Sequence, residues 1–182
     1  MEIQSQPTEP FSKRIIGKIL LDTLLVFGSG IVQTSFFPAV NLFPASPDLM
    51  LSAVVGLAVF EGERTGALAG IGAGVVAVSL GGAGTAPLPL FYMLSGYFMG
   101  IAAKVNFVRN ILSWFLYITF AALARAGLSF LYSVFTVPDV NVMVTLISVV
   151  MPEFAMTVAF SVFNYFLARL CVLPFKRSAE LT

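Results

Sequence analysis

The sequence predicts an all-α integral membrane protein, a compact bundle of six transmembrane helices. Hydrophobic residues make up 58% of its 182 residues and charged residues only 10%, whereas about 25% of an ordinary soluble domain is charged. Short polar connections separate six apolar stretches, and every second connection lacks Lys and Arg. This alternation is the positive-inside pattern of a chain that crosses a bilayer repeatedly, and it predicts that both termini are cytoplasmic.

The N-terminal segment, residues 1–18, is predicted to be cytoplasmic. Its polar beginning leads into basic residues at 13–18, and no small-residue cleavage site follows a short apolar region. We therefore expect the first span to be retained as an uncleaved anchor. The predicted transmembrane domain covers residues 19–173. Its first span, residues 19–37, is long enough at about 1.5 Å per residue to cross a hydrocarbon core of about 30 Å.

The second and third spans, residues 47–60 and 65–80, are joined by a charged turn at 61–65. Both spans are short, since a transmembrane helix needs about 20 residues. We expect a hairpin that is thinned or tilted against its neighbours. The alternative is a re-entrant hairpin, which would lower the number of spans by two and leave both termini on the same side.

The last three spans are predicted at residues 88–103, 111–135 and 142–173. A Gly- and Pro-rich loop precedes the first of them, a basic connection follows it, and a turn without Lys or Arg precedes the last. We expect a break in the last span near Pro152. The C-terminal tail, residues 174–182, is basic and is therefore predicted to be cytoplasmic.

Glycines recur every four residues in the third and fourth spans, at Gly66, Gly70 and Gly74 and again at Gly96 and Gly100. Missing side chains on one helical face allow two backbones to approach closely. We expect these glycines to pack helices together within the bundle. The alternative is an interface with a partner or with a second copy of the chain.

Three polar residues are predicted to lie deep inside apolar spans. Gln33, Arg125 and Glu153 each lie about 21–24 Å from the cytoplasmic end of their span, counted at about 1.5 Å per residue. An unpaired charge at such a depth costs at least about 2.5–3.5 kcal/mol. We therefore predict an ion pair between Arg125 and Glu153 inside the bundle, with Gln33 nearby.

Asp48 ends the tripeptide Ser-Pro-Asp, which is typical of a helix start with Ser as N-cap and an acid in the first turn. We interpret Asp48 as part of this cap or as an acid that faces a partner. Two interpretations of the deep residues stay open. The Arg125–Glu153 pair fixes the register of the helices, or Gln33 and Asp48 join it in a polar pocket that opens outward and takes a ligand or a partner's polar group.

Little in the sequence supports catalysis. The chain has no histidine and a single cysteine, Cys171, which removes the commonest general base and excludes a paired-cysteine metal site. It also lacks the motifs of a nucleophilic serine and of a phosphate-binding loop. We predict that the protein is not an enzyme and needs no cofactor. A net charge of +1 gives no reason to expect nucleic-acid binding.

Five motifs follow one another in a recognisable order. They are Gln-Thr-Ser-Phe-Phe-Pro at 33–38, Phe-Pro-Ala-Ser-Pro-Asp-Leu-Met-Leu at 43–51, the glycine-rich 66–74, Gly-Tyr-Phe-Met-Gly at 96–100 and Met-Pro-Glu at 151–153. In this order they resemble the MreD family of rod shape-determining membrane proteins. The motifs are mostly apolar, so the resemblance is one of pattern and order along nearly the whole chain.

The resemblance implies a subunit of the bacterial cell-wall elongation complex in the inner membrane, which helps to maintain rod shape by organising lateral peptidoglycan synthesis. The implied direct partner is MreC, a single-pass periplasmic protein. The wider complex would include MreB filaments, the RodA glycosyltransferase and the elongation transpeptidase, and its cytoplasmic face would meet membrane lipids. The family is expected to carry an acid late in the third helix, and residues 75–80 contain none.

The family fold is also similar to that of the substrate-binding subunits of energy-coupling-factor transporters. This similarity implies an alternative function, because fold alone does not fix function. In this alternative the chain is a small-molecule-binding transporter subunit, and Gln33, Asp48, Arg125 and Glu153 contact the ligand.

Overall fold

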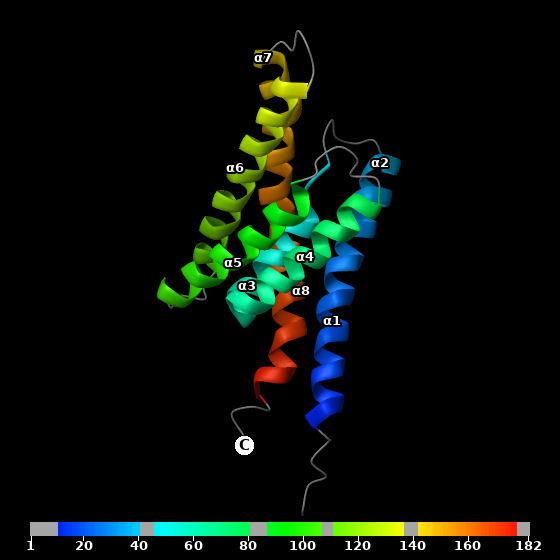
Figure 1. Ribbon diagram of the computed structural model, residues 1–182, viewed down its shortest axis with the longest axis vertical. Helices are drawn as coiled ribbons and strands as arrows, with labels where there is room; N and C mark the ends of the chain where they lie inside the picture. The colour runs from blue at the N-terminus through cyan, green and yellow to red at the C-terminus, as the bar shows by residue number, and fades with distance from the viewer. Residues whose placement is uncertain (1–10, 41–45, 81–86, 107–110, 137–141, 178–182) are drawn as a thin grey trace, which may run out of the picture.

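The computed structural model describes residues 11–40, 46–80, 87–106, 111–136 and 142–177. Within these ranges the chain is helical and contains no strand. The beginning of α1 and the end of α8 lie at the same end of the bundle, whereas the end of α6 and the short helix α7 lie at the other end (Figure 1). This arrangement agrees with an even number of crossings.

The described residues form six helical segments. The first segment comprises α1 (Phe11–Ile31), the π-helical turn η1 (Val32–Phe36) and α2 (Phe37–Val40). Four single helices follow, α3 (Leu49–Glu61), α4 (Glu63–Ser79), α5 (Leu88–Asn106) and α6 (Ile111–Thr136). The last segment comprises α7 (Val142–Thr145), the π-helical turn η2 (Leu146–Val150) and α8 (Met151–Arg177).

Four segments are long and apolar enough to cross a membrane, at Ile16–Ala39, Leu88–Val105, Ile111–Phe135 and Met143–Val172. The helices α3 and α4 have 13 and 17 residues, which corresponds to about 20 and 26 Å. Both are shorter than a hydrocarbon core of about 30 Å. The structure therefore shows a helical membrane protein with four long candidate spans, and short helices stand where the second and third spans were predicted.

The short helix α3 forms the centre of the bundle. Its residues are buried from Leu49 to Phe60, and it contacts α1, α4, α5, α6 and α8. Its sequence explains this position, because Ser52 is its only polar residue before Glu61 and a helix that is apolar on every face is buried. The side chains of Met50 and Leu57 are completely enclosed.

The helices α4 and α5 touch along their backbones. A Cβ atom added to Gly66 would lie 2.7 Å from the carbonyl oxygen of Gly96. A Cβ atom added to Gly70 or Gly74 would overlap backbone atoms of α5, and one added to Gly100 would overlap backbone atoms at the start of α4. The structure thus places all five predicted packing glycines at an internal contact, where close backbone approach requires a missing side chain.

Each π-helical turn ends just before a proline-containing stretch. Phe37 and Met151 each donate the backbone N–H to the carbonyl five residues back, and Pro38 and Pro152 follow directly. A proline ring clashes with the carbonyl four residues back, and one wider turn moves that carbonyl away. The first helix therefore continues to Val40, past its predicted end, and the last is widened ahead of Pro152 and not broken there.

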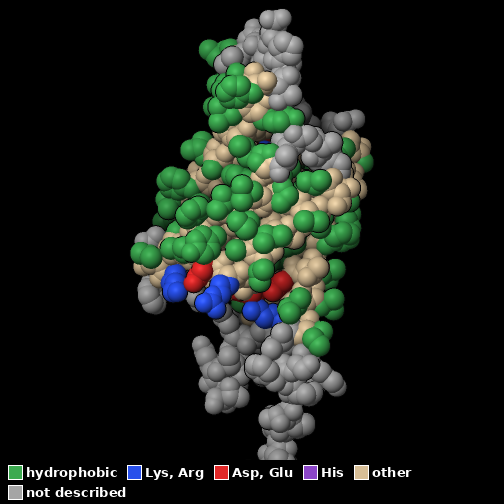
Figure 2. All heavy atoms as spheres, viewed as in Figure 1, with side chains coloured by type: hydrophobic (Ala, Val, Ile, Leu, Met, Phe, Trp, Pro, Cys, Tyr) green, Lys and Arg blue, Asp and Glu red, His purple; other side chains and the backbone are tan. Residues whose placement is uncertain are grey.

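Acidic and basic side chains gather in one band on the face shown in Figure 2, with hydrophobic side chains above it. Near the turn between α3 and α4, Lys18 Nζ lies 2.8 Å from Glu61 Oε2, and Lys104 Nζ lies 3.3 Å from Glu63 Oε1. The backbone N–H at the start of α4 and the neighbouring Lys104 hold the pKa of Glu63 below its usual value. The side chains of the predicted basic tails, at 13–14 and 176–177, lie outside the described residues.

Candidate functional site

Asp48 caps α3 from inside the bundle. Only 2% of its side chain is exposed, and its Oδ1 accepts a hydrogen bond of 2.9 Å from the backbone N–H of Leu51. This bond satisfies one of the N–H groups that the start of a helix leaves free. The N-cap is therefore Asp48, and the sequence-based placement of the cap at Ser46 is wrong by two residues.

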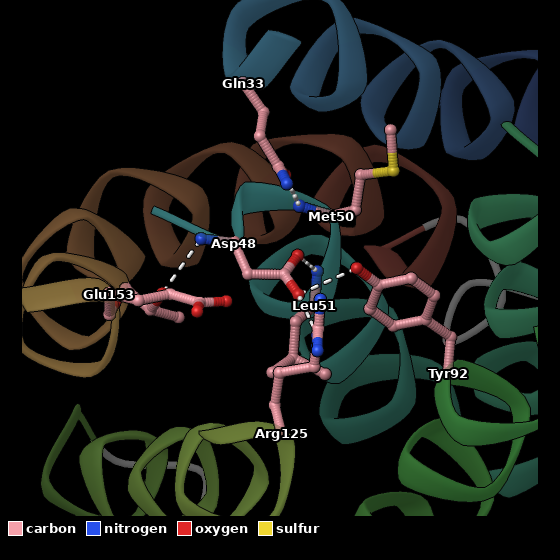
Figure 3. A network of polar contacts seen from close by, with 8 residues as sticks. Gln33, Asp48, Met50, Leu51, Tyr92, Arg125 and Glu153 are labelled. Atoms are coloured by element: carbon pink, nitrogen blue, oxygen red, sulfur yellow. Dashed lines mark hydrogen bonds and ion pairs between the residues drawn. The ribbon is translucent and has the colours of Figure 1, made fainter. Parts of the chain in front are cut away.

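The carboxylate of Asp48 also joins three helices (Figure 3). Its Oδ2 accepts hydrogen bonds from the Tyr92 hydroxyl at 2.7 Å and from Arg125 Nε at 3.3 Å. The backbone N–H of Asp48 donates to Thr157 Oγ1 at 2.8 Å, and that hydroxyl donates in turn to the carbonyl of Glu153 at 2.7 Å. One buried acid thus ties α3 to α5, α6 and α8.

The predicted ion pair between Arg125 and Glu153 is not formed. Among the described residues, Arg125 pairs with Asp48, and Glu153 points its carboxylate toward both of them from the α8 side without an ion pair (Figure 3). The reason is the length of α3. Because this helix starts inside the bundle, Asp48 lies at the depth of Arg125. Its Oδ2 is 3.3 Å from Arg125 Nε, and the charge interaction is strongest with the nearest carboxylate.

Two amide side chains hold the first turn of α3. Gln33 Oε1, from the π-helical turn η1, accepts a hydrogen bond of 3.2 Å from the N–H of Met50. Asn164 Nδ2, from α8, donates to the carbonyl of Leu49 at 2.8 Å and to Ser52 Oγ at 2.5 Å. A helix end that is buried needs such partners, because no water reaches it. The structure therefore brings Gln33 to the same helix start as Asp48.

Sequence reasoning missed three residues of this site, namely Tyr92, Thr157 and Asn164. Tyr92 lies four residues before Gly96 and therefore on the packing face of α5, where it is almost completely buried. Thr157, Ser161 and Asn164 follow Glu153 at spacings of three and four along α8, which puts them on one helical face. A line of polar residues in an apolar helix is the signal that could have found them.

We name Asp48 and the three residues whose side chains bond to it, Tyr92, Arg125 and Thr157, the Asp48 cluster. Its arginine is a fixed cation that a ligand or partner can meet. Arg125 Nη1 is buried and has no hydrogen-bond partner among the described residues, so one guanidinium donor is still available. The Glu153 carboxylate lies on the other side of the cluster (Figure 3). No group of three or more His, Cys, Asp and Glu side chains within the described ranges could hold a metal ion. The chemistry available here is hydrogen bonding and charge pairing.

A long apolar groove separates α1 from α8. We name it the α1–α8 groove; its volume is about 560 Å³, and its lining is almost entirely apolar, including Leu21, Leu24, Gly28, Val32, Phe163 and Leu167. Its lining extends along the first helix from residue 21 to residue 37. At about 1.5 Å per residue this is about 24 Å, most of the thickness of a hydrocarbon core.

Comparisons with known proteins add no assignment to this geometry. No protein-family model, no curated protein and no solved structure matches the chain.

Proposed function

We propose that this chain is a non-enzymatic membrane scaffold of the MreD type, which binds the transmembrane helix of MreC in the α1–α8 groove. The observation that carries the proposal is the groove itself, about 560 Å³ in volume and nearly free of polar lining. A helix that lies lengthwise in a matching groove contacts it over several turns, and van der Waals packing of this kind drives helix association in membranes.

The α1–α8 groove also offers a position for close helix approach. A Cβ atom added to Gly28 would meet no atom within 4 Å, so this glycine leaves space that a partner's side chain can fill. By contrast, the five glycines between α4 and α5 are already covered by backbone. A partner helix therefore has to use a different surface from the predicted glycine faces, and Gly28 lies at the middle of the available one.

We infer that the bundle lies in a bacterial inner membrane with all six helical segments inside it and both termini in the cytoplasm. The band of charged side chains near the turn between α3 and α4 supports this orientation, since basic residues favour the cytoplasmic surface. In this arrangement the scaffold would hold MreC, and through it RodA and the elongation transpeptidase, in a fixed position relative to MreB filaments.

The substitution Gly28→Leu is expected to reduce binding of MreC by about tenfold or more, because overfilling a packed contact typically costs about 1–3 kcal/mol. Binding is measured by co-purification of tagged MreC with the full chain in detergent. Gly127→Leu on α6 is the matched control, since a Cβ atom at Gly127 also meets nothing within 4 Å. Equal recovery of MreC with both variants would count against the groove as the binding site.

The Asp48 cluster favours a second candidate function, a small-molecule-binding membrane transporter subunit. Its support is the buried Nη1 of Arg125, which lacks a partner among the described residues and could bind a ligand's carboxylate. This candidate also agrees with the expectation from the sequence that the fold is similar to that of the substrate-binding subunits of energy-coupling-factor transporters. A small acid that co-purifies with the protein and is absent from an Arg125→Gln preparation would favour transport over scaffolding.

A further inference from the structure

A second, smaller groove runs between α1 and α4. We name it the α1–α4 groove; its volume is about 300 Å³, and its lining includes Asp22, Phe27, Thr65, Leu68, Gly72 and Val76. A Cβ atom added to Gly72 would meet nothing within 4 Å, so the floor of the groove is open there. Most of the lining is apolar, and an acyl chain is the natural occupant of such a groove in a membrane.

The polar groups of this groove are gathered at one end. Asp22 and Thr65 lie near the charged band, whereas Phe27 and Val76 lie farther along the two helices. Asp22 Oδ1 is buried and is without a hydrogen-bond partner by geometry among the described residues, and the Asp22 carboxylate lies beside the carboxylate of Glu61 and the ammonium of Lys18. An unpartnered buried carboxylate oxygen is costly, so this end favours a molecule that brings a hydrogen-bond donor.

A cation stands beside the same end. Arg64 precedes Thr65 and lies one helical turn before Leu68, and both of these residues line the groove. Its side chain is exposed, and within the described part of the chain it forms no ion pair, in contrast to Lys18, which pairs with Glu61. The groove thus ends in an acceptor that lacks a donor and in a cation that lacks an anion.

We propose that the α1–α4 groove binds a phospholipid whose headgroup carries a protonated amine, as in phosphatidylethanolamine. One acyl chain lies along the apolar part of the groove, the ammonium donates to Asp22, and the phosphate lies against Arg64 and the Thr65 hydroxyl. Both halves of the headgroup then meet a group of opposite charge.

The sum of the charges supports a headgroup without net charge. Lys18 and Arg64 carry two positive charges at this end, and Asp22 and Glu61 carry two negative charges. A zwitterionic headgroup keeps this balance, whereas an anionic one adds a negative charge next to a buried carboxylate. The smaller volume and the single polar end also distinguish this groove from the α1–α8 groove, which suits a helix that is apolar along its whole length.

The test offers the purified full chain equal amounts of phosphatidylethanolamine and phosphatidylcholine in neutral detergent and counts retained lipid by native mass spectrometry. Choline carries the same charge as ethanolamine but has no N–H donor. We expect about tenfold preference for the ethanolamine lipid, as for one charge-assisted hydrogen bond. The substitution Asp22→Asn should reduce this preference toward equality, and Arg64→Gln should weaken retention of both lipids.

A filled groove provides the structural control. Gly72→Leu should lower retention of both lipids, whereas Gly127→Leu on α6 and Gly28→Leu in the α1–α8 groove should leave retention and preference unchanged. Thermal unfolding identifies variants that remain folded, and Arg64→Gln serves if Asp22→Asn does not fold. Equal retention of the two lipids by the wild type, or unchanged retention by Gly72→Leu, would overturn the proposal. Stronger retention of phosphatidylglycerol than of phosphatidylethanolamine, when these two lipids are offered in equal amounts, would overturn it as well.

Discussion

Replacement of Asp48 by alanine is expected to lower the free energy of unfolding by about 3–5 kcal/mol, because it breaks a buried ion pair and leaves one charge without a partner. The change removes the acceptor of Arg125 Nε and of the Tyr92 hydroxyl, and it also removes the cap on the N–H of Leu51. Neither donor is well placed to bond to water instead, since Tyr92 is almost completely buried and only 16% of the Arg125 side chain is exposed. Denaturant unfolding in detergent micelles measures the loss.

Glu153→Gln is the matched control for this prediction. It also removes a carboxylate, one that lies beside the Asp48 cluster, but that carboxylate forms no ion pair within the described ranges, so we expect a change within about 1 kcal/mol. Which variant loses more unfolding free energy distinguishes the observed Arg125–Asp48 pair from the Arg125–Glu153 pair that the sequence predicted. A loss for Glu153→Gln as large as that for Asp48→Ala would contradict the assignment of Asp48 as the partner of Arg125.

Adding one methyl group to α4 is expected to have opposite effects at two neighbouring glycines. Gly70→Ala should destabilise the fold by about 1–3 kcal/mol, because overpacking moves backbones apart and the added Cβ would overlap the backbone of α5 at Tyr92. Gly72→Ala should leave stability unchanged or raise it by about 0.5–1 kcal/mol, since alanine orders a helix better than glycine. The added Cβ at Gly72 meets nothing within 4 Å.

The same unfolding measurement compares both alanine variants with the wild type. Because both positions lie in one helix and receive the same atom, helix propensity affects them equally and cancels in the difference. A loss at Gly72 equal to that at Gly70 would show that the contact between α4 and α5 does not limit stability.

The helices were largely predictable because apolar runs and charged turns mark their ends directly. The predicted spans 88–103 and 111–135 differ by three residues or fewer at each end from α5 (Leu88–Asn106) and α6 (Ile111–Thr136). The second span was also predicted to be short, and α3 with 13 residues is too short to cross a hydrocarbon core by itself. Its central position depends on contacts with five other helices, which no local pattern specifies.

The depth of the candidate-site residues in the bundle was predictable from the sequence, but the ion-pair partner of Arg125 was not. Counting residues along each span brought Gln33, Arg125 and Glu153 to one level, because the rise of a helix per residue is constant. Counting residues does not tell which faces of the helices meet. That Arg125 reaches Asp48 depends on how each helix is rotated about its own axis. A π-helical turn also shifts the faces of the first and last helical segments, ahead of Pro38 and Pro152, and counting residues at a constant rise does not reveal such a turn.

The most direct test of the scaffold proposal uses the single cysteine of the chain as a reporter. Cys171 is free and lines the α1–α8 groove. Cysteines are introduced one at a time along the transmembrane helix of a cysteine-free MreC, and disulfide formation with Cys171 is measured in membranes. Because Cys171 has one fixed height in the bundle, the account predicts crosslinks at one position of MreC or at two positions three or four residues apart, and their loss with Gly28→Leu. Co-purification of MreC without a crosslink at any position would contradict binding in this groove.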